Sequence, residues 1–71
     1  MEIEYDPDAD AAYIYLDEHK KKIAAKTTKE ISEGIIVDFD TQGRMIGVEI
    51  LYAKKFLRKE TLAHAKIIGE H

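Results

Sequence analysis

The stretch that decides the fold runs from Gly34 to Leu51 and reads GIIVDFDTQGRMIGVEIL. Two segments with alternating apolar positions flank a short polar connection, and this alternation is typical of strands with one buried face. The connection begins at Asp40 and ends at Gly43, which suits a type I turn closed by a glycine bulge. The sequence therefore predicts a β-hairpin at the centre of the protein. Its inward-facing side chains are Ile35, Val37, Phe39, Ile46, Val48 and Ile50.

Upstream of this hairpin, residues 2–5 and 11–17 predict a second pair of strands around the turn Asp6-Pro7-Asp8-Ala9-Asp10. Proline presets the φ angle that such a turn needs, and aspartates bond their own backbone. Residues 23–31 are more polar and only weakly alternating, and they predict a further strand.

The tail of the chain, residues 53–68, changes to a helical composition. Phe56, Ala63 and Ile67 are spaced seven and then four residues apart, which places them on one stripe of a helix. Such a helix would cover the apolar face of the sheet.

We therefore expect an α+β fold in a single domain of residues 1–71. It would be an antiparallel four- to five-stranded β-meander over residues 2–51 with a C-terminal helix, residues 53–68, packed on one face. The expected core is Ile3, Ile14, Leu16, Ile35, Val37, Phe39, Ile46, Val48, Ile50 and Leu62.

The second face of this sheet is the candidate functional surface, because one short helix cannot cover both faces. Alternation places aromatic, apolar and acidic side chains on it together. An exposed patch of this kind usually marks an interface. The candidate interface residues are Tyr13, Tyr15, Ile36, Asp38, Met45 and Glu49.

Composition narrows the function classes. The 71 residues include 14 Asp and Glu against 11 Lys and Arg, for a formal net charge of −3, and no Cys. The length excludes a dinucleotide-binding fold or a two-domain enzyme, and the lack of Cys excludes disulfides, thiolate zinc sites and thiol nucleophiles. A core this small would gain stability from a second chain, so we expect a homodimer.

Charge and hydropathy also argue against two kinds of partner. The net charge is negative, and the basic groups Lys20–Lys22, Lys54–Lys55 and Arg58–Lys59 are short enough to be solvated faces, so nucleic acid is not an expected partner. No apolar run approaches the roughly 18 residues of a membrane span, and the N-terminus is acidic where a signal peptide would be basic. We expect a cytoplasmic protein with no membrane partner.

The quoted segments resemble the domain of unknown function 2283 family over residues 3–53. The resemblance implies a small bacterial or archaeal β-sheet protein with a C-terminal helix and no established activity. Some members look like small partners of ribonuclease-like toxins encoded beside them. Ala12 and Tyr52 stand where bulkier aliphatic and acidic residues, respectively, are common in the family. The segments that match in order and spacing are Tyr5–Leu16, Thr28–Ile31, Gly34–Asp40 and Gly43–Ala53.

The aspartates of the first turn raise the question of a metal site. Asp6, Asp8 and Asp10 occupy the first, third and fifth positions of a spacing in which Asp17 is the twelfth. A calcium loop needs Gly at its sixth position, where this chain has Ala11, and a bidentate Glu at its twelfth. Ordinary turn chemistry is the main interpretation, and a weak divalent-ion site is the alternative.

Other chemistry has less support. His19, His64 and His71 lack the spacing of a metal site or a catalytic triad. Asp38 and Glu49 lie on facing strands of the central hairpin, both on the face opposite the predicted core, but acid–base work would need a pocket that excludes water. We assign no catalytic, cofactor-binding or metal residue, and expect no enzyme activity and no cofactor.

Three function classes remain. The leading one is a protein–protein interaction module that uses the exposed face or edge of its sheet, with a second copy or another protein as partner. The second is an antitoxin-like partner of a neighbouring ribonuclease-like toxin, and it rests on the family resemblance alone. The third is a minimal metal-binding or hydrolytic enzyme, for which the residues supply no nucleophile, base and orienting group.

Overall fold

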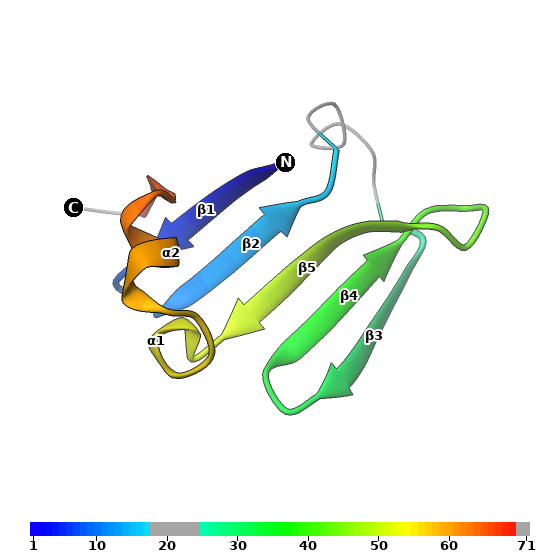
Figure 1. The fold of residues 1–71 in the computed structure, drawn as a ribbon. Coiled ribbons are helices and arrows are strands. Elements are labelled where there is room, and N and C mark those ends of the chain that lie inside the picture. Colours follow the sequence, from blue (N-terminus) through cyan, green and yellow to red (C-terminus); the bar gives the residue numbers. More distant parts are fainter. Residues whose placement is uncertain (18–24, 70–71) are drawn as a thin grey trace.

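The fold was analysed in a computed structural model, in which residues 1–17 and 25–69 are described. This part of the chain forms six strands in one sheet and two short helices (Figure 1). The strand order across the sheet is β3-β4-β5-β2-β1-β6. In chain order the elements are β1 (Glu2–Asp6), β2 (Ala11–Tyr15), β3 (Thr27–Ser32), β4 (Ile35–Phe39), β5 (Met45–Leu51), α1 (Ala53–Phe56), α2 (Lys59–Ala63) and β6 (Lys66–Ile67).

Strands β1 to β5 overlap the ranges that the sequence predicts, whereas β6 lies in the predicted helix, and the predicted meander is wrong. β2 pairs with β5 and not with β3, and β6 adds a parallel strand beside β1, so the sheet is mixed. The β2–β5 pairing sets Ala12 opposite Ile50 and Ile14 opposite Val48, which joins two apolar faces into one. The polar strand β3 lies at the edge of the sheet, where all its residues are exposed, and the more apolar strands lie nearer the centre.

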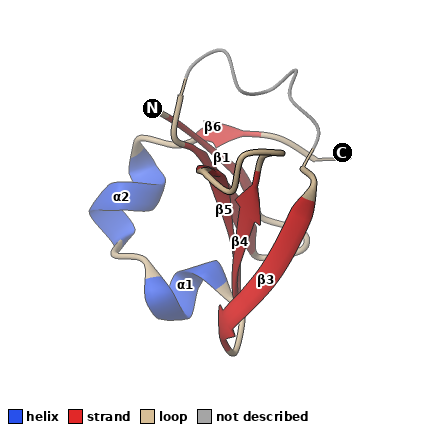
Figure 2. Cartoon of the chain, turned by 90° about the vertical axis from the view of Figure 1, so that its right-hand side faces the viewer, coloured by secondary structure: helices blue, strands red, loops and turns tan. Residues whose placement is uncertain are grey.

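The single helix predicted over residues 53–68 is also wrong. The backbone of Leu57 is extended, with φ −112° and ψ 142°, and this ends α1; Arg58 is extended as well and precedes α2. The chain then returns to the sheet, where the backbone N–H of Ile68 donates to the carbonyl of Tyr5 at 2.8 Å. Figure 2 shows both helices on one side of the sheet.

The core lies between that side of the sheet and the tail. Ala53 is completely buried, and Leu57, Leu62 and Ala65 from the tail pack against the buried cluster. The buried hydrophobic residues are Tyr5, Ala12, Val37, Ile46, Ile50 and Ala53. Of the ten predicted core residues, Val37, Ile46 and Ile50 are buried and the other seven are half-buried. No helix in the described part of the chain is long and apolar enough to cross a membrane.

Candidate functional site

The open face of the sheet, opposite the helices, carries a hydrogen-bonded network that spans three strands. The Tyr13 hydroxyl on β2 donates to Oδ2 of Asp38 on β4 at 2.6 Å. Oγ1 of Thr28 on β3 donates to the other carboxylate oxygen, Oδ1, at 2.8 Å. Asp38 therefore ties the edge strand to the middle of the sheet.

Tyr13 reaches Asp38 by passing over β5, which lies between β2 and β4. The residue beneath it is Gly47, which is buried although it has no side chain. A Cβ atom at position 47 would lie 2.6 Å from Cζ of the Tyr13 ring, well inside van der Waals contact. Gly47 is thus the seat of the ring, and the network depends on the close approach that only glycine permits.

The two tyrosines of β2 form a pair. The ring centroids of Tyr13 and Tyr15 are 4.6 Å apart with the rings tilted by 51°, a favourable aromatic geometry. The Tyr15 hydroxyl donates to Oε1 of Glu4 on β1 at 3.2 Å. Burial, followed by the hydrogen bond to Asp38, raises the pKa of Tyr13, so its phenol stays protonated as a donor at neutral pH.

The predicted carboxylate pair is arranged diagonally. Asp38 is paired with Gly47, whereas Glu49 is paired with Ile36 on one side and Tyr13 on the other. Both carboxylate oxygens of Asp38 already accept hydrogen bonds within the sheet. A phenol with a raised pKa is a poor proton source near neutral pH, so this arrangement does not suit acid–base chemistry. Its hydrogen bonds instead hold the side chains of the open face in place.

Of the six predicted interface residues, five lie half-buried on this face: Tyr13, Tyr15, Ile36, Asp38 and Glu49. Met45 departs from strict alternation. A register shift between Asp38 and Phe39 brings Met45 opposite Phe39, and Met45 is 51% exposed. Sequence reasoning missed Thr28 and Gly47, whose roles depend on the order of the strands.

The edge strand β3 is the second part of the candidate site. All six residues of β3 are exposed, and the described sheet ends there. Its pairing with β4 is regular from Thr27 to Glu30, and a register shift follows between Glu30 and Ser32. The opposite end of the sheet differs, because β6 pairs alongside β1.

The aspartate turn has structural partners for its carboxylates. Oδ1 of Asp6 accepts from the backbone N–H groups of Asp8 and Ala9, at 2.9 and 3.4 Å. Oδ1 of Asp10 accepts from the Tyr5 hydroxyl at 2.8 Å and from the backbone N–H of Lys54 at 3.1 Å. The hydrogen bond to Asp10 raises the pKa of Tyr5. The turn thus connects the first hairpin to α1.

Metal ligation has little support in the described residues, where no group of three or more His, Asp or Glu side chains could hold an ion. Asp17 follows the end of β2 and is exposed. His64 ends α2 and is exposed, while His19 and His71 lie outside the described residues, as do Lys20–Lys22.

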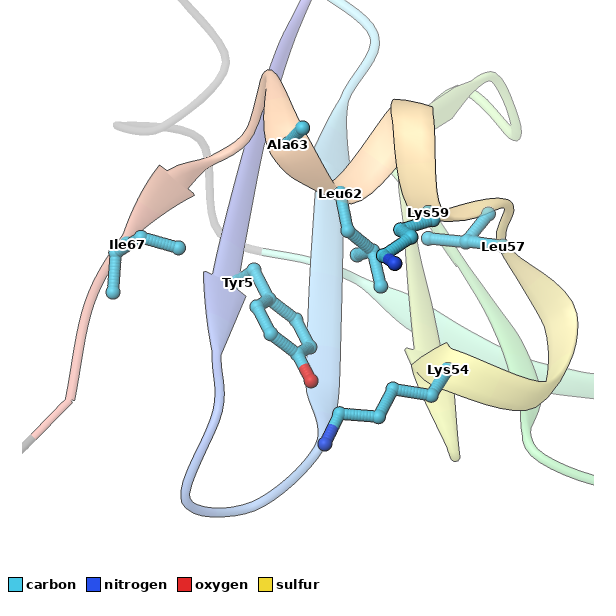
Figure 3. Close-up of a pocket in the computed structure, with 7 residues that line it drawn as sticks. All are labelled: Tyr5, Lys54, Leu57, Lys59, Leu62, Ala63 and Ile67. Atoms are coloured by element: carbon cyan, nitrogen blue, oxygen red, sulfur yellow. The ribbon is translucent and has the colours of Figure 1, made fainter.

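The tail creates a feature that sequence reasoning did not find. A groove of about 530 Å³ lies between the two helices and the β1–β6 side of the sheet, with Tyr5 and Ile67 in its lining (Figure 3). The groove exists because the tail breaks at Leu57 instead of continuing as one helix across the sheet. The only sequence signal was an excess of apolar residues in the tail over those that one helical stripe would bury. The lining residues are Tyr5, Lys54, Leu57, Lys59, Leu62, Ala63 and Ile67.

Together these features define a small α+β domain with one helix-covered face, one open face and one open edge. The chain belongs to the family described as protein of unknown function (DUF2283), whose family model matches residues 2–54. The match covers β1 to β5 and the beginning of α1, so the groove-forming part of the tail lies beyond it. No curated protein and no solved structure matches the chain.

Proposed function

We propose that this protein is a protein–protein interaction module that forms a homodimer through the open edge of its sheet. The observation that carries the proposal is β3, which is exposed at all six residues and ends the described sheet. An edge strand offers backbone N–H and C=O groups to which a further strand can add. A second copy would extend the sheet and supply burial that a 71-residue chain lacks.

The edge is a better contact than the open face alone. On the face, the hydroxyls of Tyr13 and Tyr15 and the carboxylate of Asp38 are already engaged within the chain. Burying the face would add apolar contact but no main-chain bonds. At β3 the backbone itself supplies the bonds, and the open faces of two copies would become one continuous surface.

Charge complementarity favours a second copy as the partner and sets its register. In a symmetric antiparallel pair the two-fold axis stands perpendicular to the sheet, and directly opposed residues point to the same face. With the axis at Thr28, Lys26 of each copy lies opposite Glu30 of the other. Axes at Lys29 or Glu30 would set like charges directly opposite, which is destabilising.

The structure of the strand is consistent with this register. The Thr28 side chain is held on the open face by its bond to Asp38, and alternation within β3 puts Glu30 on that face as well. Pairing with Glu30 of a second copy requires Lys26, one residue before β3, to follow the same alternation. The backbone N–H of Lys26 donates to the carbonyl of Phe39 at 2.9 Å, so the chain still lies beside β4 at this position. The register shift after Glu30 ends the regular segment.

Sedimentation velocity between about 5 and 500 micromolar would test the proposal, because this range brackets weak and transient interfaces. We expect a concentration-dependent dimer. Glu30→Lys or Lys26→Glu alone should raise the dissociation constant about tenfold, since each replaces two cross-strand attractions by two repulsions. The chain with both substitutions should regain the wild-type constant, because the reciprocal pairs are restored with their signs exchanged.

Lys29→Glu is the matched control. It changes the charge of the same strand by the same amount, but position 29 lies opposite Thr27 in the proposed register. We expect it to alter the dissociation constant much less than Glu30→Lys. A wild-type chain that stays monomeric throughout, or a double variant as weak as either single variant, would contradict the proposed homodimer.

A further inference from the structure

The groove between the tail and the sheet is an apolar space that the described residues leave open. Its volume of about 530 Å³ lies within the roughly 300–1,000 Å³ typical of small-molecule sites. Tyr5 and Leu62 project toward one another from the sheet and from α2 (Figure 3). Ile67, on β6, also lines the groove and is 54% exposed. The lining therefore favours an occupant that covers hydrocarbon.

The polar groups of the lining restrict what the occupant can be. Among the lining side chains only Tyr5, Lys54 and Lys59 carry hydrogen-bonding atoms, and the Tyr5 hydroxyl already donates to Asp10. A peptide laid in the groove would leave N–H and C=O groups without partners, which is costly. An alkyl chain has no such groups to satisfy.

The two lysines place positive charge at the border of the groove. Lys54 comes from α1 and Lys59 from α2, so two ammonium groups border one apolar space from separate elements. Neither side chain forms an ion pair with any residue that the structure describes. An ammonium beside an apolar space attracts an anionic head, and its hydrogen bonds to a carboxylate are charge-assisted.

We propose that this groove binds a single-chain amphipathic carboxylate, with the alkyl chain against Tyr5, Leu62 and Ile67 and the carboxylate at Lys54 and Lys59. The inference does not rest on the proposed dimer, because the groove lies at the β1 and β6 side of the sheet and β3 forms the other edge. Failure of one proposal therefore leaves the other standing.

Isothermal titration of the full chain with dodecanoate, below its micellar concentration, tests the site. We expect saturable binding with one ligand per chain. Dodecyltrimethylammonium, with the same chain and the opposite charge, should bind about tenfold more weakly or not at all. Vesicles of an anionic two-chain phospholipid should not bind the protein, because the groove accommodates one chain and presents no flat apolar surface.

Charge reversal supplies the second arm. Lys54→Glu together with Lys59→Glu should weaken dodecanoate about tenfold and favour the cationic ligand. Lys55→Glu with Arg58→Glu is the matched control, since both positions are exposed on the same segment, outside the lining, and carry the same change in charge. Equal affinity in the two double variants, no saturable dodecanoate binding, equal binding of the two ligands by the wild type, or binding to the vesicles would overturn the proposal.

Discussion

The two edges of the sheet differ in whether the chain itself covers their backbone groups. At one edge the chain covers itself: β6 lies parallel to β1, and the backbone N–H of Ile68 donates to Tyr5. At the other edge β3 has no such cover in the described residues, and each of its six residues is exposed. This difference is the reason that we propose β3 as the place where a second copy adds.

Tyr13 adds a side-chain link from β2 across β5 to Asp38 on β4, and disrupting its seat should give the largest effect on stability. Gly47→Val would place side-chain atoms where the Tyr13 ring lies, with Cβ 2.6 Å from its Cζ atom. We expect the free energy of unfolding to fall by about 3 kcal/mol, at the upper end of the range for overpacking. Urea unfolding, followed by circular dichroism, measures the change.

The control for this prediction is the same substitution in a chain that already carries Tyr13→Ala. With the ring removed, Gly47→Val should cost less than about 1 kcal/mol, because valine favours strand geometry and has room. An equal cost in both backgrounds would mean that the ring does not rest on Gly47.

Making the two edges alike should have the next largest effect. A chain that ends before Lys66 lacks β6 and the bond from Ile68 to Tyr5. We expect the free energy of unfolding to fall by about 1–2 kcal/mol, from the lost hydrogen bonds and the newly exposed backbone of β1. Urea unfolding at low protein concentration measures this loss.

The same truncation should also change association. With two open edges, Glu30→Lys should no longer suppress dimers, because β1 can pair instead. A chain that ends after Gly69 retains β6 and is the matched control. If Glu30→Lys suppresses dimers equally in the long and the truncated chain, β6 does not protect the β1 edge.

A smaller effect is expected from alkaline pH. The folded chain raises the pKa of Tyr13 above the ordinary tyrosine value of 10.0, through burial and then its bond to Asp38. Below pH 10 this stabilisation is fully present. Above pH 10 the unfolded chain loses the tyrosine proton while the folded chain retains it, so stability falls as pH rises toward the folded pKa.

Tyr13→Phe should remove this part of the alkaline loss, at a cost of about 1 kcal/mol at neutral pH for the missing hydrogen bond. Urea midpoints between about pH 8 and 11 show the slope. Some slope should remain, because the pKa of Tyr5 is also raised by its bond to Asp10. Tyr52→Phe, which alters an exposed ring, is the control. Identical slopes for wild type and Tyr13→Phe would contradict the assigned cause.

Local patterns in the sequence predict β1 to β5 but not β6, and they do not predict which strands are neighbours. Alternation and turn residues locate both hairpins because the interactions involved are short-range. The pairing of β2 with β5 depends on which apolar faces meet, and alternation states only which side chains share a face. The tail shows the same limit: the predicted stripe of Phe56, Ala63 and Ile67 is wrong, because all three residues are exposed and Ile67 pairs with the β1 edge.

In the candidate site, too, local patterns predict which residues share a face but not which strands lie side by side. Tyr13, Tyr15, Ile36, Asp38 and Glu49 could be assigned to one face from alternation alone. The partners of Tyr13 could not, because they lie on β4 and β5 and depend on strand order. Thr28 and Gly47 have ordinary sequence contexts, and their roles appear only when the strands are side by side.

We propose that β3 pairs with a second copy while β1 is covered within the chain. Amide hydrogen exchange at low and high protein concentration compares the two edges in a single experiment. We predict that exchange of the β3 amides slows as concentration rises, while exchange of the β1 amides stays the same. Exchange of the β3 amides that is independent of concentration, or slowing at β1 instead of β3, would contradict the account.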